Sequence, residues 1–118
     1  MRNELSAEDF SEFLSHARYY HGEGKKVEAA VIASAIFEDT IKRLGRAHGL
    51  TDLTKLEGTI NALKATGAFS SVEAKRLKYF AGIRNSALHA SWDEFDLAAV
   101  GDLIAGVEHL IKDLSTAP

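Results

Sequence analysis

The chain has 118 residues, of which 46% are hydrophobic and 26% charged, the balance of one globular domain spanning residues 1–118. It contains no cysteine, which excludes a disulfide framework, a thiol nucleophile and a cysteine-ligated metal centre. The net charge of −3 argues against a protein that coats nucleic acid through positive charge alone, but allows a local phosphodiester site. No segment resembles a signal peptide or a membrane span, so we expect a cytoplasmic protein without a membrane partner.

Residues that favour helices run through the whole chain, and its single proline is the last residue. Because proline interrupts helices and none lies inside the chain, we predict an all-α fold, a compact bundle of about five helices. The first helix is expected to begin at LSAEDF and to end before HGEGKK. Ser6 and Asp9 form a candidate capping box at its start, and Leu5 is placed to pack on Phe10 as a hydrophobic staple.

Glycines delimit the second and third predicted helices. The second is expected from about Lys26 to His48 and stops at Gly49, a typical helix C-cap position. Its alanine-rich sequence permits close approach of neighbouring helices. The third is expected near Thr54–Thr66, followed by Gly67. One face of this segment carries Leu53, Leu56, Ile60 and Leu63.

The last two predicted helices flank the segment ASWDE. The fourth opens with a second candidate capping box, Ser70 and Glu73, and extends to about His89. The fifth runs from near Asp93 to Leu114. Apolar residues recur along the fifth in steps of three and four, at Leu97, Val100, Ile104, Val107, Ile111 and Leu114. This spacing is typical of a seam that packs against other helices.

A positive charge interrupts the apolar line of the fourth helix. Leu77, Ala81 and Leu88 keep one face inward, and Arg84 falls among them. Because arginine is rarely buried without a partner, we expect a bidentate ion pair with Glu38, which lies close to the inward face of the second helix. One interpretation is that this pair is purely structural and ties two helices together.

The other interpretation is catalytic and adds Asn85 and His89. An arginine keeps its proton near neutral pH and therefore holds a phosphate and stabilises its developing charge. A histidine exchanges a proton near pH 7, and Asn85, one turn away, is placed to orient the imidazole or a phosphate oxygen. These are the minimum groups for RNA cleavage without a metal, with His89 activating the ribose 2′-hydroxyl. The alternative for His89 is a simple cap that interacts with the helix dipole.

The segment IRNSALH resembles the R-x4-6-H motif of the HEPN superfamily, with Arg84, four intervening residues and then His89. Asn85 matches the polar residue that commonly follows the arginine in that family. The helix EAAVIASAIFEDTIKRL is similar to the alanine-rich helix of a bacterial HEPN subgroup. In that match Glu38 takes the acidic position and Lys42 the basic position four residues later. The resemblance covers roughly Lys26 to Leu114.

The resemblance implies a helical bundle that forms a homodimer, so that the motifs of two subunits face one shared cleft. It implies RNA as the substrate, cleavage without metal or cofactor, and a 2′,3′-cyclic phosphate product. Many members act as toxins or in defence against phage, which implies an antitoxin or a larger defence complex as partner. Other members have lost activity and serve as binding or dimerisation modules, and a non-catalytic module of this kind is the alternative interpretation for the chain.

Two further sets of residues are candidate binding sites. Lys75, Arg76 and Lys78 precede the motif on its own helix and are placed to steer an RNA backbone, although solvated helix surfaces have the same composition. His16 and His21 are five residues apart and therefore point to different sides of a helix. We expect no metal site and no cofactor from this pattern.

Overall fold

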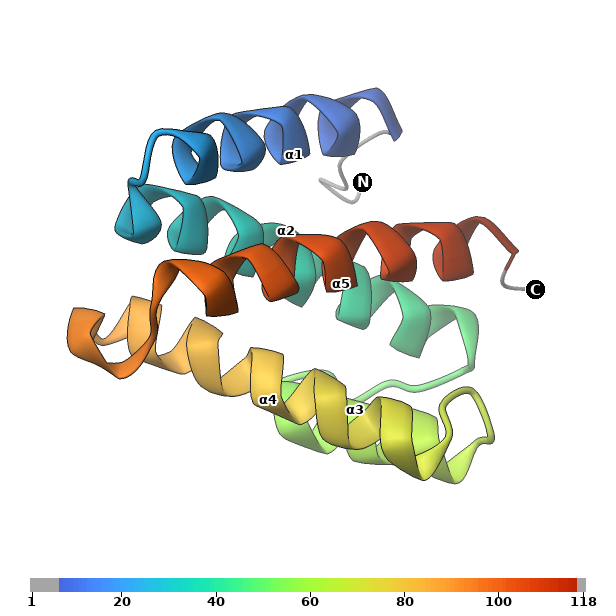
Figure 1. Cartoon of the computed structure of the whole chain (residues 1–118). Coiled ribbons are helices and arrows are strands. Elements are labelled where there is room, and N and C mark those ends of the chain that lie inside the picture. The colour runs from blue at the N-terminus through green and yellow to red at the C-terminus, as the bar shows by residue number, and fades with distance from the viewer. Residues whose placement is uncertain (1–6, 117–118) are drawn as a thin grey trace.

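The computed structural model describes residues 7–116, and α-helices make up most of this range (Figure 1). The elements are α1 (Ala7–Gly22), α2 (Lys26–Ala47), α3 (Leu56–Ala65), α4 (Ser71–Leu88), a 3₁₀ turn (Trp92–Glu94) and α5 (Leu97–Thr116). About 80% of residues 7–116 are helical, and this range contains no strand. The predicted all-α bundle of five helices is therefore confirmed. The staple and capping box at Leu5 and Ser6 lie outside the described residues.

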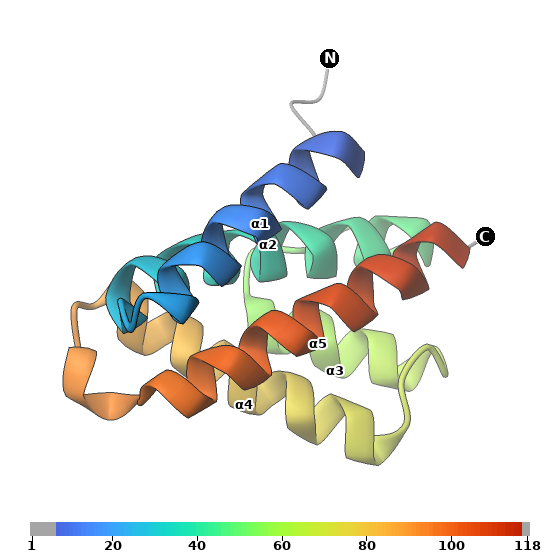
Figure 2. The ribbon, with the colours of Figure 1, turned by 45° about the horizontal axis from the view of Figure 1, so that its top comes forward.

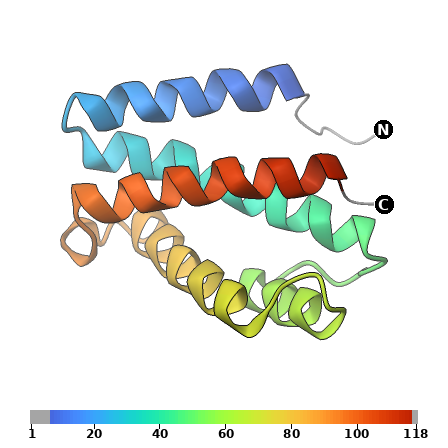
Figure 3. The same ribbon diagram turned by 45° about the vertical axis from the view of Figure 1, so that its right-hand side comes forward.

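Helix α2 is the centre of the bundle, because it contacts each of the other four α-helices. α1 lies on one side of α2, whereas α3 and α4 lie on the other (Figures 1 and 3). α5 packs against α1, α2 and α4, and Figure 2 shows α1 and α5 lying obliquely to α2. Buried residues of α2 include Ala29, Ala30, Ala33, Ile36, Phe37, Ile41 and Leu44. The three alanines, expected from the sequence to permit close packing, are fully buried.

The bundle has the dimensions of a single domain. Its radius of gyration is 13.6 Å, close to the roughly 13–14 Å expected for a compact domain of this length. One cluster of buried apolar side chains extends through all five helices. In the part of the chain that the structure describes, no helix combines the length and the apolar character needed to cross a membrane.

The helices α1 to α4 end in the same way, with one residue in the left-handed conformation and a hydrogen bond that spans the turn. Three of these residues are glycines: Gly24, Gly49 and Gly67 have φ of 75°, 81° and 87°. The fourth is Ala90, with φ of 56° after α4, where the Ser91 N–H donates to the Ser86 carbonyl at 2.8 Å. Since a side chain disfavours this conformation, the end of α4 is strained where the other ends are relaxed.

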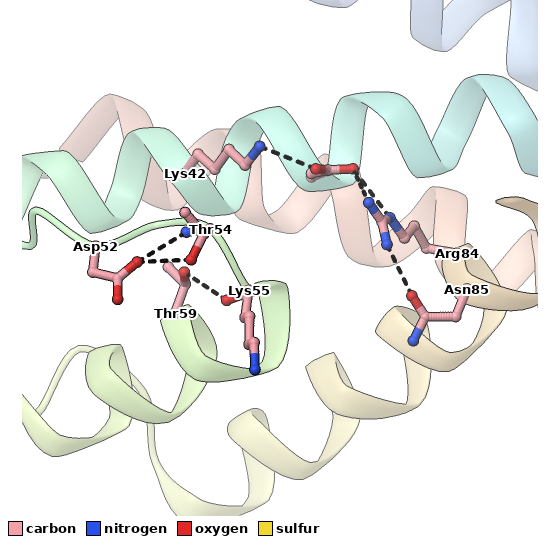
Figure 4. A network of polar contacts seen from close by, with 8 residues as sticks. Lys42, Asp52, Thr54, Lys55, Thr59, Arg84 and Asn85 are labelled. Carbon is pink, nitrogen blue, oxygen red and sulfur yellow. Dashed lines mark hydrogen bonds and ion pairs between the residues drawn. The ribbon is translucent and has the colours of Figure 1, made fainter.

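Two predicted helix starts need correction, and a third is confirmed. α5 begins at Leu97 rather than near Asp93, because the Asp96 carboxylate accepts the Ala99 N–H at 2.8 Å and caps the helix there. Phe95 before it is extended and buried. α3 begins at Leu56, after a turn in which Asp52 accepts the Thr54 hydroxyl at 2.8 Å (Figure 4). The capping box at the start of α4 is present: the Glu73 N–H donates to the Ser70 hydroxyl, and the Ser70 N–H donates to the Glu73 carboxylate.

Candidate functional site

The candidate site lies where α2 crosses α4. Phe37 on α2 and Phe80 on α4 are buried, and their rings meet edge to face with centroids 6.1 Å apart. Glu38 directly follows Phe37, and Arg84 lies one helical turn beyond Phe80. The aromatic contact therefore fixes the two helices at the level where their charged side chains meet.

Glu38 and Arg84 are in direct contact, as the charges on two apolar faces had suggested. The Arg84 Nε and Nη2 atoms donate to Glu38 Oε1 at 3.0 and 2.8 Å. The other carboxylate oxygen, Oε2, lies 3.0 Å from Lys42 Nζ. Figure 4 shows Lys42 and Arg84 approaching the same acidic side chain from two directions. Because Lys42 holds one oxygen, both arginine donors share the other, and the geometry differs from the expected bidentate pair with two oxygens.

Asn85 extends this contact away from α2. Arg84 Nη1 donates to Asn85 Oδ1 at 2.9 Å, and the Asn85 side chain is exposed (Figure 4). The Nη1 and Nη2 atoms each carry a second hydrogen, and the Arg84 side chain remains 23% exposed. The guanidinium is therefore oriented by three hydrogen bonds and retains two N–H groups with which to bind an anion.

The site has a positive charge balance although the whole chain is acidic. Arg84 and Lys42 together outweigh the single charge of Glu38 by one unit. Partial burial acts to raise the pKa of Glu38, but the hydrogen bonds and charges of Arg84 and Lys42 prevail and hold that pKa below its ordinary value. Glu38 is consequently ionised at neutral pH and orients both cations, while one unit of positive charge remains.

A groove of about 290 Å³ adjoins the pair between α2 and α4. Its lining residues are Val31, Ser34, Ala35, Glu38, Arg84, Ala87 and Leu88. Leu88 was predicted to face the core, but 64% of its surface is exposed, and Ile83 and Ala87 are the buried residues at this end of α4. Successive helical residues turn by about 100°, so burial of Ala87 directs Leu88 into the groove. Val31 on the opposite wall is 48% exposed.

His89 is less closely connected to the site than the sequence suggested. It is the C-cap residue of α4 and is exposed, and its ring makes no hydrogen bond or ion pair within the described residues. Arg84 and Asn85 are in contact with each other, but the groove lining does not include His89. The structure thus brings together Glu38, Lys42, Arg84 and Asn85, and leaves His89 at the nearby helix end.

The three basic residues earlier on α4 do not act as one surface. Lys75 is exposed and Lys78 is half-buried. Arg76 is exposed and lines the cavity between α4 and α5, with its guanidinium carbon 5.5 Å from the centre of the Phe80 ring on its own helix. Lys75 and Lys78, three residues apart, lie along one side of α4, and a role of the three cations in steering RNA stays a prediction.

Lys26 holds the segment that follows α4 and was not identified from the sequence. Its Nζ atom donates to the carbonyls of Trp92 at 2.8 Å and Phe95 at 2.9 Å. These bonds tie the segment after His89 to the start of α2. No local pattern predicts a contact over this sequence separation, although a lysine at a helix start, where cations are disfavoured, is a signal that it has another role.

The chain matches no family model, no curated protein and no solved structure.

Proposed function

We propose that the chain is a metal-independent endoribonuclease of the HEPN type that acts as a homodimer. The observation that carries the proposal is the Arg84 cluster: a guanidinium oriented by Glu38 and Asn85, with a net positive charge, at the edge of a groove and five residues before a histidine. A preorganised cation of this kind binds a phosphate without reorganising during the reaction.

In this mechanism each residue has a separate task. The two remaining N–H groups of Arg84 bind the non-bridging oxygens of the scissile phosphate and stabilise the charge that develops on them. His89 takes the proton of the ribose 2′-hydroxyl, whose oxygen attacks phosphorus as the bond to the 5′-oxygen breaks. His89 of the partner subunit gives that 5′-oxygen its proton. The products are a 2′,3′-cyclic phosphate and a 5′-hydroxyl, with one P–O bond formed, one broken, and one proton passed to and one from a histidine.

The groove supplies the dimer interface of the proposal. Its rim carries the exposed apolar side chains Val31 and Leu88 beside the charged pair, a combination that favours burial against a second copy. Leu88→Glu is expected to convert a dimer to a monomer in analytical ultracentrifugation. Val72→Glu is the matched control, since Val72 is 79% exposed on the same helix and outside the groove lining. Equal dissociation of both variants, or a monomeric wild type at tens of micromolar, would contradict this interface.

Cleavage is tested with mixed RNA in excess chelator. The wild type is expected to produce fragments that end in a 2′,3′-cyclic phosphate, and His89→Ala to abolish them with unchanged helical content and melting. His16→Ala is the control, because His16 is another exposed histidine and lies on α1. Arg84→Lys keeps the charge but loses the planar fork, and is expected to reduce the rate by about 10²-fold or more. Equal activity of wild type and His89→Ala would contradict the mechanism.

A second candidate is a non-catalytic dimerising module in which the Glu38–Arg84 pair is structural. It is favoured by one observation: within the described residues no interaction joins the His89 ring to the arginine cluster. A well-folded dimer that cleaves none of the tested RNAs supports this module. Growth arrest on expression, relieved by His89→Ala, would instead support a toxin that requires an antitoxin.

A further inference from the structure

A second cluster of chemically active side chains lies at the other end of α4. Glu73 comes from the first turn of α4, and His109 and Asp113 come from the second half of α5. One donor atom from each of these three residues lies within 4.8 Å of the other two. They line a cavity of about 290 Å³ between the two helices, separate from the groove beside Arg84. We propose that this cluster binds one divalent transition-metal ion, Zn²⁺ by its chemistry.

The spacing of the donors suits one ion. His109 and Asp113 are four residues apart on one helix face, with His109 Nε2 4.0 Å from Asp113 Oδ2. Metal–ligand distances of about 2.0–2.2 Å place two donors roughly 3–4 Å apart, so small rotations of these side chains complete the geometry. Glu73 reaches the same point from α4, so the site joins two helices that are distant in sequence.

Glu73 is held ready for this role by its own backbone contact. Its Oε1 atom accepts the Ser70 N–H at 3.0 Å in the capping box, which fixes the carboxylate over the first turn of α4. Among the described residues, the second oxygen of Glu73 makes no hydrogen bond or ion pair. Carboxylates that bind metals are usually oriented by a hydrogen bond to their other oxygen, as Glu73 is here.

The donor set selects the kind of ion. One imidazole nitrogen and two carboxylate oxygens suit Zn²⁺, with water in the fourth position, better than Mg²⁺ or Ca²⁺, which prefer oxygen donors alone. One wall of the cavity is apolar and consists of Phe69, Leu77, Phe80 and Leu110. Arg76 also lines the cavity, and its positive charge opposes the ion. We therefore expect micromolar rather than tighter affinity.

The proposed metal site is independent of the proposed nuclease function and differs from the expectation of no metal site. The sequence signal was weak because only two of the three ligands are close in the chain. An ion in this position would link the start of α4 to the end of α5 and stabilise the folded protein. Removing it would leave the Arg84 cluster intact, so cleavage in excess chelator and metal binding are separate measurements.

The test uses the untagged full-length chain, freed of metal and titrated with ZnCl₂ by isothermal calorimetry. We expect one ion per chain and a melting temperature that rises with ZnCl₂ concentration. His109→Ala and Glu73→Gln are expected to weaken binding by at least about tenfold, and glutamine retains the capping box. His16→Ala is the matched control, because His16 and Glu12 form the same spacing on α1 at 4.0 Å. No binding at millimolar ZnCl₂, or equal loss in His16→Ala and His109→Ala, would overturn the proposal.

Discussion

The Glu38–Arg84 pair yields a quantitative prediction about stability. Their side chains are 28% and 23% exposed, so the pair lies between a fully buried ion pair and a surface one. Removing one partner of a fully buried pair costs about 3–5 kcal/mol, whereas exposed pairs contribute roughly 0–1 kcal/mol. With two short hydrogen bonds to one oxygen, we expect a coupling energy of about 1–2 kcal/mol between positions 38 and 84. Each alanine variant alone should lower the free energy of unfolding by about 2 kcal/mol.

The assay is a double-mutant cycle of Glu38→Ala, Arg84→Ala and the double variant, with urea unfolding followed by circular dichroism. All four proteins are compared at one concentration, because a dimer would make stability depend on concentration. Arg18 and Glu108 provide a matched pair between α1 and α5, with a contact of 2.8 Å but side chains 49% and 41% exposed. Its coupling should stay below about 0.5 kcal/mol. Additive losses at 38 and 84, within about 0.3 kcal/mol, would refute the reasoning.

Three further predictions concern single positions. Because folding lowers the pKa of Glu38, the contribution of this carboxylate to stability is complete above its ordinary pKa of 4.5 and is lost as the pH falls through the pKa of the folded state. The difference in urea midpoint between wild type and Glu38→Gln should therefore shrink over that pH range, and a constant difference would contradict the prediction. Ala90→Gly should raise the free energy of unfolding by about 1 kcal/mol because glycine relieves the left-handed strain, whereas Gly67→Ala should lower it by a similar amount. A lower free energy of unfolding in Ala90→Gly would show the strain to be absent. Ser34→Ala removes a buried hydroxyl that has no hydrogen-bond partner within the described residues, so stability should be unchanged or higher, and a loss above about 1 kcal/mol would reveal a bond made in the dimer.

The helices could be predicted because their signals are local. Apolar spacing marked the five segments, Ser70 and Glu73 marked the start of α4, and Gly49 marked the end of α2. The contact between Glu38 and Arg84 could be anticipated for a different reason: each is a charge on a face that packs inward, and burial requires an opposite partner. Rules of this kind predict the five helices and one contact between two of them.

The remaining features depend on how helices cross, which no local pattern specifies. Leu88 continues the apolar line in the sequence of α4, yet the packing of α4 against its neighbours buries Ala87 and leaves Leu88 exposed. Phe95 falls within the predicted fifth helix, but it is extended and enters the core before α5 begins. The approach of Glu73 to His109 likewise follows from the packing of α4 on α5. Each of these depends on tertiary packing that overrides spacing along one helix.

The parts of the candidate site differ in how firmly they are held, and this difference bears on how the proposed reaction is completed. Arg84 is oriented by Glu38 on the central helix α2 and by Asn85, so the group proposed to bind phosphate is in position before any ligand arrives. His89 is exposed, has no side-chain hydrogen bond or ion pair within the described residues, and precedes the strained Ala90. A base must lie within hydrogen-bonding reach of the proton it removes, and nothing in residues 7–116 holds His89 there. In the proposed mechanism, the RNA or the second subunit must therefore position the histidine. In the proposed homodimer, a second subunit meets this requirement and also covers the exposed rim of the groove.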